Sequence, residues 1–268
     1  LISYALMLVC VTTCVYSTDF LQINIGRKSD IWYGGTEDYV NYRILNDSYN
    51  FIEDLQTYGG FLYRTEPSGA LVVYLSCTGF YGSLLKVVQS ITKIPSNDLL
   101  IGTRVLCTLV TSGIFTAISL RIKKQVGIIA SLLFSFLALI AYWLIGPSSH
   151  LIWFFPILLI PFGIGIFLYP MVIKEKISFK RYLLFAFIGY ILVFLRSYVY
   201  TPVLALSGAI PVFFYEINRR ENWKTILWRC VQICLMGVLG FFIVILIHFI
   251  QLWLYLGTAS EAADQLIF

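Results

Sequence analysis

The sequence predicts an all-α protein, a polytopic bundle of transmembrane helices with one large external loop near its N-terminus. The chain is 59% hydrophobic and 12% charged, with a mean hydropathy of +0.83, whereas a soluble domain is about 25% charged. Long apolar segments recur along the chain, and a helix needs about 20 such residues to cross a bilayer. Basic residues gather in short connections between these segments. Together these observations predict a multi-pass membrane protein.

Seven apolar segments are expected to form the spans, although 201–215 is short and would cross beside its neighbours. They are Leu1–Tyr16, Leu99–Leu120, Gln125–Ile145, His150–Ile173, Arg181–Tyr198, Thr201–Tyr215 and Ile226–Gly257. The first segment opens without methionine, and the sequence stops on an apolar residue, Phe268. We therefore expect the protein to begin upstream and to continue beyond residue 268. The first segment could instead be the tail of a signal peptide, but Ser17–Phe20 lacks the small residues of a cleavage site.

The positions of the basic residues predict the orientation. They cluster in three connections, Arg121–Lys124, Lys174–Arg181 and Arg219–Lys224. Cytoplasmic connections of membrane proteins are rich in Lys and Arg, so all three are expected in the cytoplasm. The spans at 99–257 then alternate consistently, and residues 17–98 and the tail 258–268 lie outside.

One segment of the external region is apolar enough to resemble a further span. In Leu71–Ile91, apolar residues recur at helical spacing, and Ser83, Lys86 and Ser90 fall on the opposite face. Such a pattern is typical of an amphipathic helix that lies along the membrane interface. We expect this orientation, because a crossing helix here would reverse every later loop. The alternative is an ordinary span whose polar stripe packs on neighbours.

Functional motifs are few. The sequence has no P-loop, GxSxG, HExxH or GxGxxG motif, two histidines, and nothing that points to a nucleic acid partner. Arg104, Arg196 and Arg229 lie near the ends of expected spans, where snorkelling explains them. Residues 17–70 hold eight acids, four bases and many aromatic residues, a composition that suits carbohydrate binding. A solvated acidic loop with interfacial tyrosines is the alternative.

Several short stretches resemble the GT-C superfamily of polyprenyl-phosphate-dependent glycosyltransferases, in its uncharacterised bacterial type. Val73–Gly82 is similar to the Tyr-x-Ser-x-x-Gly-Leu-Gln-Gly element of its first external loop, with Phe80-Tyr81 in place of Leu-Gln. Tyr142-Trp143 and Trp153–Phe162 resemble its aromatic Tyr-Trp…Leu-Pro-Phe run, and Leu195–Thr201 resembles a further external turn. The plan of one N-terminal span, a large acidic external loop, a helix along the membrane and many later spans is also similar.

The resemblance implies an enzyme of the bacterial inner membrane that moves a sugar from a polyprenyl-phosphate carrier to an acceptor on the external face. An acid just after the first span would act as the catalytic base or help to hold a metal, and Asp19 occupies that position. Further candidate acids are Glu37, Asp38 and Glu66. The candidate substrate-binding residues are Arg196, Arg104, Lys86 and Tyr74. The two arginines would bind the donor phosphate, because a guanidinium matches phosphate geometry, and Lys86 on the polar face of its helix would meet lipid headgroups.

The implied partners are the lipid-linked sugar donor, membrane lipid and an acceptor whose identity the sequence does not indicate. A divalent cation is the one cofactor that the resemblance leaves open. Two other classes stay open. One is a polymerase, ligase or transporter of lipid-linked oligosaccharides. The other is a non-catalytic membrane subunit of a larger complex.

Overall fold

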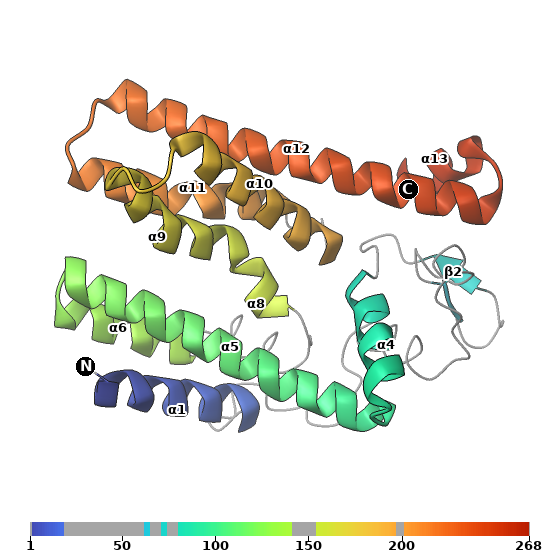
Figure 1. Ribbon diagram of the computed structural model, residues 1–268, viewed down its shortest axis with the longest axis horizontal. Helices are drawn as coiled ribbons and strands as arrows, with labels where there is room; N and C mark the ends of the chain where they lie inside the picture. Colours follow the sequence, from blue (N-terminus) through green and yellow to red (C-terminus); the bar gives the residue numbers. More distant parts are fainter. Residues whose placement is uncertain are drawn as a thin grey trace. The chain divides into compact units, whose positions relative to one another are not determined.

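The computed structural model describes residues 2–18, 62–64, 71–73, 80–140, 154–196 and 201–267. Apart from turns and two three-residue strands, these residues are helical, which confirms the all-α class (Figure 1). The chain divides into two compact units. The first unit includes α1, α5 and α6, the second includes both strands and α9 to α13, and α4 and α8 contain the boundaries between them.

The first unit is built from α1 (Ile2–Thr18), α5 (Ser96–Gln125) and α6 (Ile128–Ile140), with α1 and α6 packed against α5. A two-residue turn joins α5 to α6, and Gly127 adopts φ +122° there, a conformation that other residues rarely adopt. Small hydroxyl side chains line the contact between these two helices. Ser119 Oγ lies 2.8 Å from Ser131 Oγ and 2.7 Å from Ser135 Oγ.

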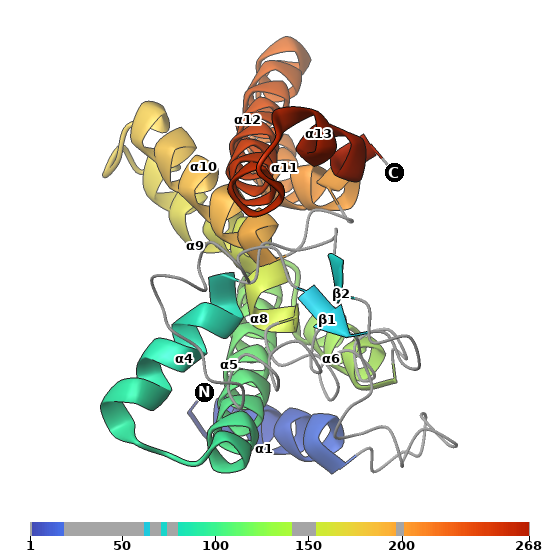
Figure 2. The same cartoon turned by 90° about the vertical axis from the view of Figure 1, so that its right-hand side faces the viewer.

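The second unit contains four helices in a closed ring: α9 (Ile160–Ile173), α10 (Phe179–Arg196), α12 (Trp223–Leu256) and α11 (Thr201–Asn218). Each packs against the next, and α11 packs against α9. The short helix α8 (Phe154–Leu158) precedes α9, and α13 (Ala259–Ile267) packs beside α12 at the C-terminal end (Figure 2). Close helix contacts depend on small residues, as is common between membrane helices.

The tightest of these contacts involve glycines and one tyrosine. A Cβ on Gly165 of α9 would lie 2.8 Å from Pro211 Cγ of α11. A Cβ on Gly208 would overlap the hydroxyl of Tyr190. That hydroxyl donates a hydrogen bond of 2.7 Å to the carbonyl oxygen of Ala205, which joins α10 to α11 in the middle of the ring. A methyl group at either glycine would therefore push two helices apart.

The expected helix Leu71–Ile91 is wrong at its start. Leu71–Val73 forms strand β2, which pairs antiparallel with β1 (Leu62–Arg64), and the helix α4 is Phe80–Thr92. The local sequence explains the difference, because Val72 and Val73 are β-branched and turn-forming residues precede them. Of the expected apolar stripe, Phe80, Leu84 and Ile91 are exposed on α4, and Val87 is half-buried. Its placement along a membrane stays a prediction.

A helix is present at each of the seven expected spans where the chain is described, with α8 and α9 together occupying the fourth. Two helices are long and apolar enough to cross a membrane, with candidate spans at Ile101–Gln125 of α5 and Trp223–Leu254 of α12. Shorter apolar helices occupy Ile2–Cys14, Ile128–Ile140 and Ile160–Ile173. The helix α11 continues past the expected end at Tyr215 to Asn218, and this difference matters for the site below.

Candidate functional site

The candidate acids and one candidate binding residue lie outside the described residues. They are Asp19, Glu37, Asp38, Glu66 and Tyr74. Their assignment as base, metal-holding or substrate-binding residues therefore stays a prediction.

Three candidate cations lie within described helices. Arg196 is the last residue of α10 and is 6% exposed, so protein encloses its guanidinium, unlike a snorkelling side chain. Lys86 lies on α4 and is half-buried. Arg104 lies on α5 of the first unit, and its side chain is outside the description. The structure thus places two of the three, Arg196 and Lys86, in the same compact unit.

A hydrogen bond fixes the beginning of α4 to the end of α10. The Tyr81 hydroxyl donates to the carbonyl oxygen of Leu192 at 2.9 Å, one helical turn before Arg196. Burial raises the pKa of Tyr81, so the phenol keeps the proton that it donates. The contact between the amphipathic helix α4 and α10 therefore lies about one helical turn from the buried Arg196.

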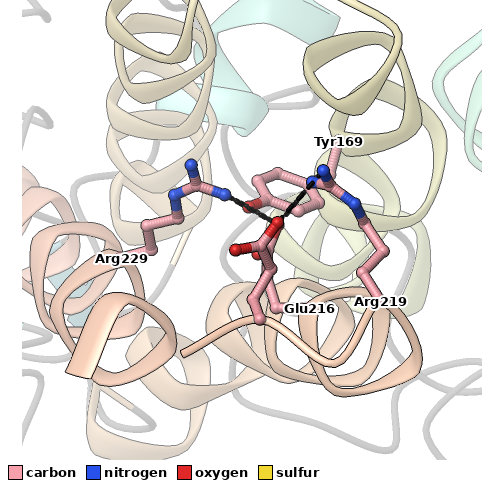
Figure 3. A network of polar contacts seen from close by, with 5 residues as sticks. Tyr169, Glu216, Arg219 and Arg229 are labelled. Carbon is pink, nitrogen blue, oxygen red and sulfur yellow. Dashed lines mark hydrogen bonds and ion pairs between the residues drawn. The ribbon is translucent and has the colours of Figure 1, made fainter. Parts of the chain in front are cut away.

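A network of hydrogen bonds and ion pairs is centred on Glu216, which the sequence did not single out. We call Glu216, Tyr169, Arg219 and Arg229 the Glu216 cluster (Figure 3). Glu216 Oε1 accepts hydrogen bonds from the Tyr169 hydroxyl and, at 2.8 Å, from Arg229 Nη1. Arg229 Nη1 also donates to the Tyr169 hydroxyl oxygen at 3.1 Å. The three side chains come from α11, α9 and α12, so the cluster ties three of the four ring helices together.

Burial makes this pairing necessary. Glu216 is fully buried, and an unpaired buried carboxylate costs several kcal/mol. Arg219 Nη1 approaches Oε1 to 3.6 Å and its Nη2 approaches Glu221 Oε1 at 3.1 Å, which makes the group of two arginines and two glutamates formally neutral. Glu216 Oε2 is buried without a hydrogen-bond partner among the described residues. The two arginines compensate the negative charge of the Glu216 carboxylate, but its Oε2 accepts no hydrogen bond from the described residues.

Aromatic rings pack against two members of the cluster, Tyr169 and Arg229. The ring of Tyr169 contacts those of Tyr182 and Tyr215 at centroid distances of 5.3 and 6.2 Å. The guanidinium carbon of Arg229 lies 5.6 Å from the centroid of the Phe179 ring, which suits a cation–π contact. These rings restrain the orientation of Tyr169 and Arg229, whereas the Arg219 and Arg229 side chains stay 40% and 29% exposed.

The structure corrects the interpretation of Arg229 as a snorkelling side chain. Its guanidinium turns toward Glu216 within the helix ring instead of extending away from it. Sequence reasoning missed this pair because Glu216 follows the expected span and precedes a basic loop, where an acid resembles an ordinary loop residue. The useful signal was the apolar run on either side, Phe213–Tyr215 and Ile217, which keeps Glu216 within the helix. Among the described residues, no group of three or more His, Cys, Asp or Glu could hold a metal ion.

Comparisons with known proteins do not identify a family. No protein-family model, curated protein or solved structure matches this chain.

Proposed function

We propose that the chain is an integral, multi-pass membrane protein. The supporting observation is that α5 and α6 bury polar side chains and expose apolar ones, the reverse of helices in water. The buried polar residues of α5 are Thr103, Thr108, Thr111, Ser112, Thr116 and Ser119. Its exposed apolar residues are Ile101, Val105, Leu106, Leu109 and Val110. Continuous apolar surface of this kind fits lipid contact.

The helix α12 supports the same placement. Exposed apolar side chains follow its length, and exposed tryptophans, Trp228 and Trp253, occur near its ends. The axial separation of these two residues is about 38 Å at 1.5 Å per residue. A hydrocarbon core is about 30 Å thick, and tryptophan gathers at its two interfaces. The basic loops 174–178 and 219–222 lie at one end of the second unit, which fits their proposed placement in the cytoplasm.

Within this membrane protein, we propose transfer of a sugar from a polyprenyl-phosphate carrier to an acceptor on the external face. The observation that carries this proposal is the contact of Tyr81 with α10 near the buried Arg196. It joins the amphipathic helix that follows the acidic segment to the end of α10 opposite the basic loops. Arg196 would bind the donor phosphate there, since a guanidinium matches phosphate geometry.

The proposed reaction is a substitution at the anomeric carbon. The acceptor hydroxyl oxygen attacks this carbon, the bond from carbon to the phosphate oxygen breaks, and the polyprenyl phosphate leaves with the electron pair. The carboxylate of Asp19 takes the proton of the acceptor hydroxyl. General-base catalysis typically contributes about 10²–10⁴-fold to a rate.

The test is sugar transfer by the purified protein in bilayers that contain a polyprenyl-phosphate-linked sugar. Asp19→Asn keeps the size of the side chain and removes its basicity, so turnover should fall by about 10²-fold or more. Asp30→Asn is the matched control, because Asp30 lies in the same acidic segment and has no assigned role. Arg196→Lys should raise KM for the donor more than it lowers kcat. Transfer at the parent rate by Asp19→Asn would exclude Asp19 as the base. Full activity in the Glu37, Asp38 and Glu66 variants as well would favour a non-catalytic subunit.

A further inference from the structure

One end of the second unit is strongly basic. The loops 174–178 and 219–222 and the adjoining helix turns hold eight cations and three carboxylates. The cations are Lys174, Lys176, Lys180, Arg181, Arg219, Arg220, Lys224 and Arg229. Most are exposed, whereas Arg229 is 29% exposed and is held by the Glu216 cluster. This end therefore combines a diffuse positive charge with one ordered guanidinium.

The ordered guanidinium retains donors for a ligand. Arginine carries five N–H groups, and Arg229 directs both N–H groups of Nη1 to Glu216 and Tyr169. Within the described ranges, no protein acceptor forms a hydrogen bond with its Nε or Nη2. The contacts to Glu216, Tyr169 and Phe179 restrain the side chain. A guanidinium held in this way loses little conformational entropy when it binds an anion.

The surroundings of Arg229 suit a lipid more than a small soluble anion. Phe179 contacts the guanidinium, and the next two residues of α10, Lys180 and Arg181, are exposed cations. On α12, the preceding residues Leu227 and Trp228 are exposed apolar side chains, with Trp228 60% exposed. Cationic and apolar side chains thus occur together at this end of the second unit, a combination that the phosphate and acyl chains of one phospholipid would require.

We propose that Arg229, Lys180 and Arg181 form a binding site for the phosphate headgroup of an anionic phospholipid. Nε and Nη2 of Arg229 donate to the phosphate oxygens, the two cations of α10 add charge, and an acyl chain lies along Leu227 and Trp228. The site rests on the membrane placement proposed above and is independent of sugar transfer, because it lies at the opposite end of α10 from Arg196. Glu216 is a positioning residue, because it accepts a hydrogen bond from Nη1 of Arg229 and so holds the guanidinium in place.

The test measures lipid preference with the full chain reconstituted in vesicles. Brominated phosphatidylglycerol and brominated phosphatidylcholine each quench tryptophan fluorescence, and their ratio gives a relative binding constant. The difference between the parent and Trp228→Phe isolates the signal of Trp228. We expect phosphatidylglycerol to bind near Trp228 at least fivefold more strongly than phosphatidylcholine, since each nearby Lys or Arg contributes about fivefold to the affinity for an anionic lipid.

Charge-matched variants separate a site from general attraction. Lys180→Gln/Arg181→Gln should bring the preference close to parity, since each removed cation contributes about fivefold, whereas Lys174→Gln/Lys176→Gln on the neighbouring loop should change it less than twofold. Arg229→Lys keeps a charge for Glu216 and removes the guanidinium, so it should lower the preference while the protein stays folded. An equal loss in the two double variants would overturn the proposal in favour of diffuse charge.

Two further results would also overturn it, for different reasons. Loss of the preference in millimolar inorganic phosphate at constant ionic strength would identify a site for a soluble anion. Release of the chain from membranes by alkaline carbonate would instead contradict the membrane placement itself. A chain that stays in the membrane and does not distinguish the two lipids would refute the lipid site alone.

Discussion

Two glycines of α9 provide a test of how the second unit packs. Gly163 and Gly165 lie two residues apart in the same helix. A Cβ on Gly165 would lie 2.8 and 2.9 Å from Pro211 Cγ and Cβ and 3.3 Å from the Gly208 carbonyl oxygen. A Cβ on Gly163 would meet no atom within 4 Å. Replacing each with alanine therefore makes the same chemical change in two different environments.

The magnitudes follow from these distances. Carbon atoms pack best at about 3.5–4.0 Å, so the Gly165→Ala methyl would be about 0.7 Å too close to a rigid proline ring. Inserting a methyl group into a packed contact typically costs about 1–3 kcal/mol, and the higher helix propensity of alanine offsets about 1 kcal/mol of that. We expect Gly165→Ala to destabilise by about 1 kcal/mol. Gly163→Ala has the propensity gain alone and should stabilise by up to about 1 kcal/mol.

The assay is unfolding of the purified protein in a mild detergent with an increasing fraction of dodecyl sulfate, followed by tryptophan fluorescence. The quantity compared is the difference in the free energy of unfolding between the two variants, expected at about 2 kcal/mol. Equal stability, or a more stable Gly165→Ala, would refute the close approach of α9 and α11 at Pro211.

Three other predictions concern ionic pairing, the central hydrogen bond and orientation. Arg229→Gln should lower the free energy of unfolding by about 3 kcal/mol by leaving a buried carboxylate with weaker pairing, and adding Glu216→Gln should recover most of that loss; additive effects would contradict the pairing. Tyr190→Phe should cost about 1 kcal/mol in the same assay through the lost hydrogen bond to α11, and an unchanged value would argue against this bond. Single cysteines placed in the loops 174–178 and 219–222 should react with an impermeant reagent only after cells are opened, and labelling of either loop in intact cells would refute the proposed orientation.

The helices were predictable because their signal is long and local. In α5 and α12, mostly apolar sequence over many turns predicts a helix, and both helices lie where the sequence placed them. The start of α4 was not predictable from periodicity, since Leu71–Val73 fits a helical stripe and also favours a strand. Pairing with Leu62–Arg64 decided between the two, and such pairing is a tertiary contact that a helical pattern does not contain.

The Glu216 cluster shows a second limit. Glu216, Tyr169 and Arg229 of this cluster lie apart in the sequence and become neighbours only once three helices pack together. Taken singly, Arg229 near the start of an apolar segment indicates a side chain that reaches the interface, and Glu216 beside Arg219 indicates a charged loop. The pairing depends on the helical phase of α11 and on its extra turn to Asn218, neither of which the sequence pattern determined.

The ion pair of Glu216 and Arg229 has a consequence for how the chain would insert into a membrane. Glu216 lies near the end of α11 and Arg229 near the start of α12, consecutive helices joined by a short turn. A single charged residue in the middle of a helix raises the free energy of insertion by about 2.5–3.5 kcal/mol, and less near an end. Each helix would enter lipid more readily with its opposite charge already paired. We therefore expect α11 and α12 to enter the membrane together as a helical hairpin. Tyr169 of α9, which precedes them in the chain, would then donate its hydrogen bond to Glu216.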